Sequence, residues 1–207
     1  MNQMEQLYRT SSHPATFAKG YLDYLREVLS SLDVEAIGSF IGVLLEARER
    51  GARIFFFGNG GSASTASHFA NDLAMGCQSW EKPFRALSIT DNISILTALS
   101  NDYGYDEVFV RQLQTQMERG DVVVAISASG NSPNVVKAIE YAKANGAFTV
   151  GLTGFDGGQL KQEAHLNLHI PTNKGEYGPA EDGHIIIDHL VGSYLLNLCR
   201  AEPRGEK

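Results

Sequence analysis

Residues 53–72 read R-I-F-F-F-G-N-G-G-S-A-S-T-A-S-H-F-A-N-D and predict a strand, a glycine turn and a helix in direct succession. The run Ile54–Phe57 is β-branched and aromatic, which is typical of a strand buried on both faces of a parallel sheet. Three glycines and one asparagine follow at 58–61, and Ser62–Ala74 has helical content without proline. This order places free backbone N–H groups and the positive end of a helix at the carboxyl edge of the strand, which suits an anion such as phosphate.

The composition of the chain is that of one soluble globular domain. Its 207 residues are enough to bury a core, and its 43% hydrophobic and 20% charged residues are ordinary proportions. The net charge of −7 argues against nucleic acid as the main partner. The chain has only two cysteines, and its opening residues lack an apolar signal core. No apolar stretch approaches the ~20 residues of a membrane span. These features predict a cytoplasmic protein without a membrane partner.

Predicted helices and strands alternate on either side of this stretch. Two helices precede it, at about 17–32 and 34–50, and they serve either simple packing or an oligomer interface. After it we expect four strands at 84–89, 121–126, 148–153 and 166–170, turns at 101–105 and 154–158, and helices at 91–99, 106–117, 133–145 and 179–199. The alternation predicts an α/β fold with a doubly wound parallel sheet.

A second polar turn follows the strand at 121–126. Ser127, Ser129 and Ser132 lie between that strand and a helix that begins at Pro133, so we expect them at the carboxyl edge of the sheet as well. Serine hydroxyls and helix-end N–H groups bind phosphate, although serines at helix starts are also common caps. Two such turns in one parallel sheet favour a shared ligand at a topological switch point.

The glycine turn itself leaves several interpretations open. Gly58–Ala63 satisfies the loose G-x-G-x-x-A dinucleotide pattern, but the acidic residue that this pattern needs after the second strand would be Asp91, which comes late. No Gly-Lys-Ser/Thr follows the glycines, which excludes a nucleotide P-loop. A tight turn without a ligand is a further interpretation. The two turns together favour a phosphate monoester, such as a sugar phosphate, and no nucleotide cofactor.

Ionisable residues gather on two of the predicted helices. His68 and Asp72 are four residues apart and share one helical face, where a surface pair without function is an equal alternative. The final helix carries four ionisable residues among isoleucines: Glu181, His184, Asp188 and His189. Polar groups in such apolar surroundings need a partner or a function. His184 and His189 point about 140° apart on an ideal helix, so we expect them to have different roles.

These motifs resemble those of the sugar isomerase (SIS) domain family, and most closely the sedoheptulose 7-phosphate isomerases, also called phosphoheptose isomerases. The shared motifs are G-N-G-G-S at 58–62, S-x-S-G-N-S at 127–132, N-D-Y-G-Y-D-E-V-F at 101–109 and T-G-F-D-G-G at 153–158. The resemblance covers about residues 33–198 and implies a flavodoxin-like, five-stranded SIS domain over 1–207, with a helical segment at 1–32 and a frayed tail at 202–207. It also implies a homotetramer, with a dimer as the alternative, whose active sites lie between subunits.

The resemblance also implies roles for individual residues. The implied substrate-binding residues are Asn59, Gly60, Gly61, Ser62, Asp91, Ser127, Ser129, Asn131, Ser132 and Glu181. Asp72 and His189 match the acid/base pair of the family, and some members bind zinc at positions that match His68, Asp72, Glu181 and His189. Glu181 and His189 are eight residues apart, about 12 Å along a helix. They therefore meet one metal only if Glu181 lies at or before the helix start, or if another subunit supplies one of them.

The sequence departs from the heptose enzymes at four positions. Asp72 replaces a Glu, Glu181 a Gln, Gly76 an Arg and Ala128 a Thr. We expect a ketose–aldose isomerase of a sugar phosphate, with sedoheptulose 7-phosphate as substrate, Asp72 and His189 as proton carriers through an enediol(ate), and Zn²⁺ as cofactor. The alternative is a non-catalytic binding or adaptor module, like the replication-initiator-binding relatives that lack the helical carboxylate.

Overall fold

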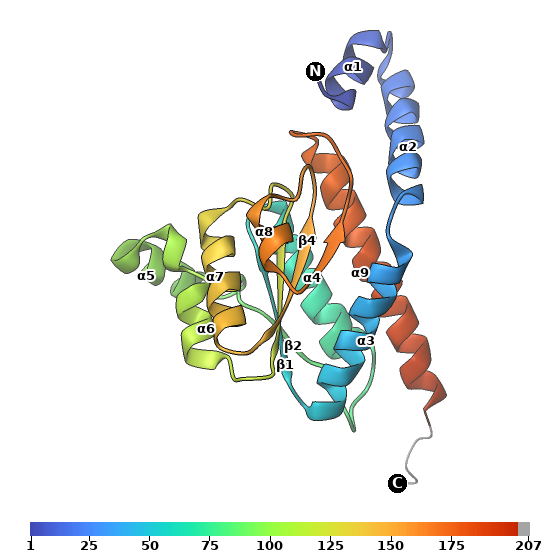
Figure 1. Cartoon of the computed structure of the whole chain (residues 1–207). Coiled ribbons are helices and arrows are strands. Elements are labelled where there is room, and N and C mark those ends of the chain that lie inside the picture. Colours follow the sequence, from blue (N-terminus) through green and yellow to red (C-terminus); the bar gives the residue numbers. More distant parts are fainter. Residues whose placement is uncertain (203–207) are drawn as a thin grey trace.

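A parallel sheet of five strands in the order β2-β1-β3-β4-β5 forms the centre of the computed structural model, which describes residues 1–202 (Figure 1). The strands are β1 (Arg53–Gly58), β2 (Arg85–Ser88), β3 (Val122–Ser127), β4 (Phe148–Thr153) and β5 (Leu166–His169). Every pair of neighbours is parallel, which confirms the predicted doubly wound α/β fold. The frayed tail predicted at 202–207 lies, from residue 203 onward, outside the described residues.

Side chains of the central strands alternate between two apolar layers. Phe56 and Val124 point to one face of the sheet, while Phe55, Phe57 and Val123 point to the other. All five are fully buried. The continuous apolar run in β1 is therefore explained by helices that cover both faces of the sheet.

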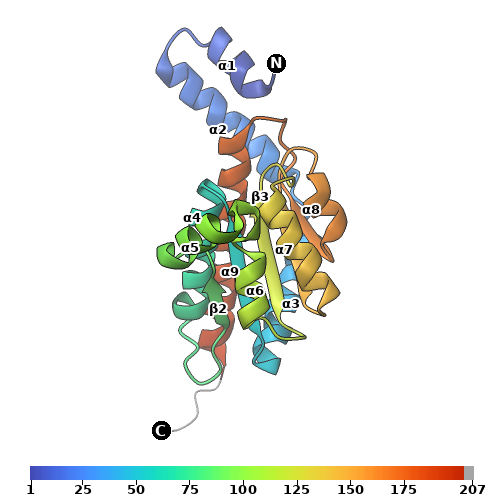
Figure 2. The same cartoon turned by 90° about the vertical axis from the view of Figure 1, so that its left-hand side faces the viewer.

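Helices cover the two faces separately, as Figures 1 and 2 show. The first face holds α3 (Val34–Arg50), α4 (Gly61–Asn71) and α9 (Tyr177–Ala201). The second face holds α6 (Val110–Gln116), α7 (Pro133–Ala144) and α8 (Gly158–Glu163), with α5 (Ile93–Tyr103) beside them. The N-terminal helices α1 (Gln3–Thr10) and α2 (Pro14–Ser30) extend past the sheet beside the first turns of α9.

Several boundaries differ from those that the sequence predicts. Helix α5 continues through residues 101–103, where we expected a turn, and ends at Gly104, which has a positive φ of 89°. The helix expected at 106–117 is divided into a 3₁₀ turn at Tyr105–Glu107 and α6. Helices α1 and α8 are additional, and α9 begins two residues earlier than expected, at Tyr177.

The sheet reverses its winding between β1 and β3. The chain leaves β1 through α4 on one face and leaves β3 through α7 on the other. Gly58 pairs with Ile126 in this part of the ladder, so the glycine turn and the serine turn are direct neighbours at the carboxyl edge. This is the topological switch point at which open α/β sheets bind their ligands.

The described part of the chain, residues 1–202, contains no single helix that is long and apolar enough to cross a bilayer. Helices α2 and α3 meet that length and composition only as a pair bent by 69°.

His184 of α9 lies fully buried beneath the carboxyl end of β4. Its Nε2 lies 3.2 Å from the carbonyl oxygen of Thr153, and burial lowers the pKa of the imidazole to about 4. A histidine in this setting is neutral, so its role is to tie α9 to the sheet.

We expect His184 to lower the free energy of unfolding as the pH falls from about 6.5 to about 4. The unfolded chain takes up a proton on this imidazole below its ordinary pKa of about 6.5, whereas the folded chain does not. Stability that is present above pH 6.5 is therefore lost as the pH falls. Urea denaturation at a series of pH values should show a smaller loss in His184→Gln than in the wild type. Identical pH profiles in the two proteins would contradict this account of His184.

Candidate active site

The glycine turn joins β1 to α4 at the switch point. A Cβ at Gly58 would lie 2.6 Å from the carbonyl oxygen of Ile126, so β3 approaches too closely for any other residue. Gly60 has a positive φ of 56°, and α4 begins at the next residue. Ser62 is buried in the first turn of α4. The turn therefore presents the free N–H groups of a helix start at the carboxyl edge of the sheet.

Asn59 is held in this turn by two residues from other segments, the start of α7 and the 3₁₀ turn. Its side-chain amide exchanges hydrogen bonds of 2.9 and 3.0 Å with the amide of Asn134, at the start of α7. The hydroxyl of Tyr105 donates to Asn59 Oδ1 at 2.8 Å. We did not predict Tyr105 or Asn134 as site residues. The N-D-Y-G-Y-D run that contains Tyr105 was a signal for the first, and no sequence pattern pointed to the second.

The serine turn lies beside the glycine turn. Ser127 Oγ accepts the N–H of Gly130 at 3.1 Å, and Ser129 Oγ accepts the N–H of Asn131 at 3.3 Å. Ser132 is the N-cap residue of α7, but its side chain makes no capping hydrogen bond within residues 1–202. Its hydroxyl thus stands beside a helix start without a backbone partner there.

Asn131 and Asp91, two predicted substrate-binding residues, are engaged in other contacts. The Asn131 side chain donates to the carbonyl oxygen of Ser129 at 2.9 Å and accepts the N–H of Gln159 at 3.1 Å, which joins the serine turn to α8. Asp91 follows β2 and accepts hydrogen bonds from Ser67 of α4 and from the hydroxyl of Thr90. Both residues lie near the carboxyl edge of the sheet, and their binding roles stay predictions.

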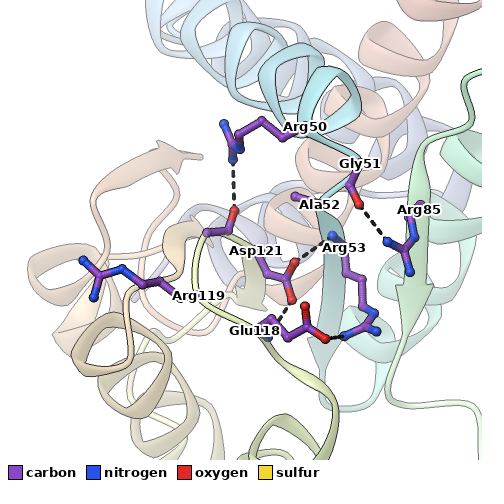
Figure 3. Close-up of a pocket in the computed structure, with 9 residues that line it drawn as sticks. Arg50, Gly51, Ala52, Arg53, Arg85, Glu118, Arg119 and Asp121 are labelled. Atoms are coloured by element: carbon purple, nitrogen blue, oxygen red, sulfur yellow. Dashed lines mark hydrogen bonds and ion pairs between the residues drawn. The ribbon is translucent and has the colours of Figure 1, made fainter.

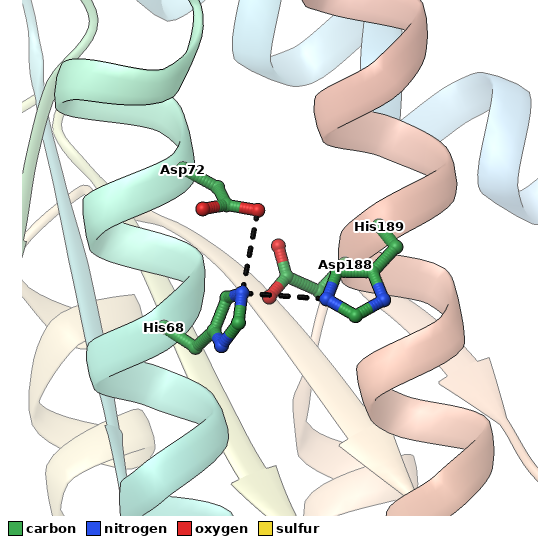
Figure 4. Close-up of side chains that lie close together, drawn as sticks. All are labelled: His68, Asp72, Asp188 and His189. Atoms are coloured by element: carbon green, nitrogen blue, oxygen red, sulfur yellow. Dashed lines mark hydrogen bonds and ion pairs between the residues drawn. The ribbon is translucent and has the colours of Figure 1, made fainter.

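Four ionisable side chains meet where α4 packs against α9, as Figure 4 shows. His68 Nε2 lies 3.5 Å from Asp72 Oδ2 and 3.3 Å from His189 Nε2. Asp188 points into the same group from α9, and one ligand atom from each of the four residues lies within 4.8 Å of the others. His68, Asp72 and His189 are thus brought together as a candidate acid/base and metal group.

Asp72 stands where the α-helical hydrogen-bond pattern changes. Residues Asp72–Gly76 form a single π-helical turn, in which the N–H of Cys77 donates to the carbonyl oxygen of Asp72 at 2.9 Å. Such turns are rare and occur frequently at functional sites. Here the π turn ends α4 and leaves the Asp72 carboxylate only 27% exposed beside His68.

Asp188 is fully buried, and its two oxygens have no hydrogen-bond partner among the described residues. Burial, with a smaller contribution from the charge of Asp72, raises the pKa of this carboxyl to about 8. An unpaired carboxylate in such surroundings needs either a proton or a cation. The sequence places Asp188 in an ionisable segment but does not predict it as part of the site.

Within this chain the structure does not bring Glu181 to the other three predicted metal ligands, so a shared metal would need Glu181 from another subunit, and its role as a ligand stays a prediction. Glu181 lies inside α9, which begins at Tyr177, and not at the helix start that a shared metal would require. Its carboxylate packs against Gly61 at the beginning of α4: a Cβ added at position 61 would lie 2.3 Å from Glu181 Oε2. Within this chain, the Glu181 carboxylate therefore lies at the start of α4, beside the glycine turn.

A separate pocket of ≈ 230 Å³ lies at the opposite, amino edge of the sheet (Figure 3). Four arginines line it, Arg50, Arg53, Arg85 and Arg119, together with other parts of the loop before β3. The first three donate to the backbone carbonyl oxygens of Gly120, Gln116 and Gly51, respectively. These bonds tie neighbouring loops together, so we assign this pocket a structural role.

Comparison with known proteins identifies the family. Residues 19–154 match the family described as SIS domain. The chain is 41% identical over 169 residues to the phosphoheptose isomerase of Geobacter metallireducens. The aligned region covers 80% of this chain and 88% of the relative. It is 38% identical over 174 residues to the probable phosphoheptose isomerase of Thermoplasma acidophilum, covering 84% and 94% of the two chains.

Solved structures agree with this assignment. The phosphoheptose isomerase of Neisseria gonorrhoeae has a TM-score of 0.77 at 30% identity, covering 87% of this chain and 95% of the other. The phosphoheptose isomerase of Francisella tularensis has a TM-score of 0.80 at 22% identity, covering 90% and 99%, and at that identity it supports the fold alone.

The close approach of the serine turn to α8 makes a prediction about Gly130. Its φ is +64°, and a Cβ there would lie 1.9 Å from the carbonyl oxygen of Gly157. Gly51 is a matched control, with a φ of +66° and open space around a Cβ. Gly51→Ala should lower the free energy of unfolding by about 1–2 kcal/mol, the cost of a left-handed backbone. Gly130→Ala should cost clearly more in the same urea titration; equal losses would refute the close contact.

Proposed function

We propose, because the chain belongs to the SIS domain family and within it to the phosphoheptose isomerases, that it interconverts sedoheptulose 7-phosphate and a heptose 7-phosphate. The sequence-based expectation of a sugar-phosphate isomerase is confirmed by these relatives. The observation that carries the proposal is the meeting of His68, Asp72 and His189 on helices that also border the two polar turns.

The phosphate of the substrate binds, in this proposal, between the two turns. Ser62, Ser127, Ser129 and Ser132 supply hydroxyls, and the starts of α4 and α7 supply N–H groups and the positive ends of two helix dipoles. Both turns, 58–62 and 127–132, contain no lysine or arginine. Neutral donors would therefore hold the phosphate, as they do at other helix starts.

The separation of the two ends of the site supports a long sugar. His68 follows Ser62 by six residues, about 9 Å along α4 at 1.5 Å per residue. A fully extended chain advances roughly 1.2 Å per bond, since about 3.6 Å spans the three bonds of a residue. Six carbon–carbon bonds and the phosphate ester then cover this distance. A seven-carbon sugar can thus keep its phosphate in the turns while its first two carbons reach His68, which contacts both members of the acid/base pair.

The proposed chemistry is a proton transfer between the two carbons at that end. One group removes the proton from the carbon beside the carbonyl, and the bonding electrons move to give an enediol(ate) whose oxygen is protonated. Returning a proton to the neighbouring carbon completes the conversion of ketose to aldose. We assign Asp72 and His189 to these transfers as a pair, and His68 orients both because it contacts each of them.

Zinc is the metal that we propose for this centre. Two imidazoles and carboxylate oxygens within 4.8 Å of one another are a donor set that suits Zn²⁺. When bound, the cation would polarise the carbonyl and stabilise the enediolate oxygens. The residues that we propose to hold it are His68, Asp72 and His189, together with a fourth ligand.

We further propose a single SIS domain over 1–207, with its core at about 33–198, that assembles as a homotetramer, with a dimer as the alternative. Leu190 and Tyr194 on the outer face of α9 are 45% and 52% exposed, and a shallow hollow lined by residues 193, 194, 197 and 198 lies on the same helix. Such a surface suits another subunit. We place the protein in the cytoplasm, and its two free cysteines, Cys77 and Cys199, are in line with a reducing compartment.

A non-catalytic adaptor is the alternative function. It would need the phosphate turns but not the pair of Asp72 and His189. The presence of both residues, positioned around His68, favours the enzyme. The two functions differ in one observable: only an isomerase exchanges solvent deuterium into the carbon beside the carbonyl of its substrate.

The proposal predicts that Asp72→Asn separates chemistry from binding. NMR of sedoheptulose 7-phosphate in D₂O should show deuterium incorporation and an aldose product with the wild type. Asp72→Asn should lower kcat about 10²–10⁴-fold, the usual contribution of general acid–base catalysis, and change substrate affinity much less. If Asp72 and His189 act as one unit, the double variant with His189→Asn should be little worse than the poorer single variant.

Ser129→Ala is the matched control for this prediction. It removes a hydroxyl from the phosphate end, so it should weaken substrate binding by about 1–3 kcal/mol, the value of a hydrogen bond to a charged group. Its effect on kcat should be small. Wild-type turnover by Asp72→Asn would exclude the proposed mechanism, and unchanged binding by both Ser129→Ala and Ser127→Ala would exclude the proposed phosphate site.

A further inference from the structure

We propose that Asp188, and not Glu181, is the fourth ligand of a divalent metal centre formed by His68, Asp72, Asp188 and His189. The inference rests on the proposed zinc centre and changes its ligand set from the one that the family resemblance implies. It also makes the centre complete within one chain, because α4 and α9 supply all four side chains.

The first argument is the state of the Asp188 carboxyl. It is fully buried, both oxygens lack a partner among residues 1–202, and it points toward the two histidines in Figure 4. Burying an unpaired carboxylate is strongly unfavourable, so such groups in proteins are paired or coordinate metals. The nearest available cation-binding groups are the ring nitrogens of His68 and His189 and the carboxylate of Asp72. A shared cation would satisfy all four residues at once.

The second argument is the spacing of the donor atoms. Tetrahedral zinc holds nitrogen and oxygen ligands at roughly 2.1 Å, which places them about 3.4 Å from one another. His68 Nε2 lies 3.5 Å from Asp72 Oδ2 and 3.3 Å from His189 Nε2, close to this separation. All four donors lie within 4.8 Å of one another, so a small rotation of the side chains would close the tetrahedron.

The third argument is the charge of the set. Two carboxylates and two neutral imidazoles carry a charge of −2, which a divalent cation cancels. Cancellation matters here because Asp188 is shielded from water, where an uncompensated charge is costly. The mixture of imidazole nitrogens and carboxylate oxygens favours Zn²⁺ over Mg²⁺ or Ca²⁺, which prefer oxygen ligands throughout.

Glu181 cannot take this place within the chain without leaving its own contact. It precedes Asp188 by seven residues, about 10 Å along α9. Its carboxylate packs against Gly61, at the start of α4, whereas His68 and Asp72 lie at the end of that helix. Glu181 therefore remains at the phosphate end, beside the path of the substrate.

A ligand at Asp188 also lessens, for Asp72, a conflict in the proposed chemistry. Asp72 and His189 serve both as ligands and as proton carriers. With Asp188 in the set, His68, Asp188 and His189 would still hold the cation while Asp72 served as a proton carrier. Three protein ligands and one open position are the arrangement that catalytic zinc sites use.

The test compares two carboxylate-to-amide variants on the same helix, Asp188→Asn and Glu181→Gln. Metal-free protein is titrated with Zn²⁺ against a chromophoric chelator, and with Co²⁺ while its visible absorption is followed, both without substrate. Asp188→Asn should weaken Zn²⁺ binding by at least about 10–100-fold, the loss seen even for outer-shell partners, and should change the Co²⁺ spectrum. Glu181→Gln should leave affinity and spectrum at their wild-type values.

The reverse pattern, with Glu181→Gln weakened and Asp188→Asn unchanged, would overturn the proposal, as would a wild-type chain that binds neither metal. Isomerase activity is not a readout here, so deuterium exchange into sedoheptulose 7-phosphate reports separately on the proposed function. If Asp188→Asn does not fold, a zinc-soaked crystal of the wild type decides the question. An anomalous peak about 2.1 Å from the Asp188 carboxylate supports the proposal, and a peak without contact to Asp188 overturns it.

Discussion

The packing of α4 against α9 is the interaction on which the candidate site depends. Both helices lie on the same face of the sheet, and their starts meet where the Glu181 carboxylate rests against Gly61. Further along, His68 meets His189, and Gly192 faces the Asp72 side chain, whose Oδ2 would lie 3.6 Å from a Cβ at position 192, an ordinary van der Waals distance. The helices approach closely at the first contact because residue 61 is a glycine, where a Cβ would lie 2.3 Å from Glu181 Oε2. A side chain at position 61 would therefore displace the Glu181 carboxylate or move the two helices apart there.

The same packing divides the site into two ends with different physical character. At the start of α4, backbone N–H groups and serine hydroxyls are uncharged hydrogen-bond donors, and the positive end of the helix dipole also favours an anion. At its end, carboxylates and imidazoles create an environment for a proton or a cation. The helix fixes the distance between the two ends, so in the proposed function it would set the length of the substrate that can occupy both.

The sequence predicted those parts of the fold that depend on local patterns. Strand β4 and helix α3 have the expected bounds, and β1 and β3 differ by one residue at each end, because apolar runs bounded by turn residues identify buried strands. Helices α1 and α8 were missed because they are short, eight and six residues, and their stability comes from contacts with distant segments. The end of α5 was missed because Asn101–Tyr103 looks like a turn, whereas the helix continues to Gly104.

The site was predictable to a smaller degree. Neighbouring turns at one sheet edge follow from parallel topology, so the two phosphate turns could be placed together. The i, i+4 rule placed His68 beside Asp72. It could not say that Asp188 faces the same group, because that depends on how α9 is rotated against α4. Nor could it show that Tyr105 reaches Asn59, since 46 residues separate them and only the fold brings them together.

The acidic substitutions of this chain gain a common explanation from the position of Asp188. The heptose enzymes that the chain resembles carry a Glu and a Gln where this chain has Asp72 and Glu181. Asp72 is shorter than a Glu and reaches less far from α4. Glu181 stands where the resemblance implies a Gln ligand, and its carboxylate lies against Gly61 at the start of α4. A centre with only His68, Asp72 and His189 would then hold a divalent cation with a single negative charge. The carboxylate of Asp188, buried between the two helices, supplies the missing negative charge. It comes from α9, so its position does not depend on whether residue 72 is an Asp or a Glu. The chain can therefore vary its proton-carrying residue and still keep the charge that a divalent metal needs.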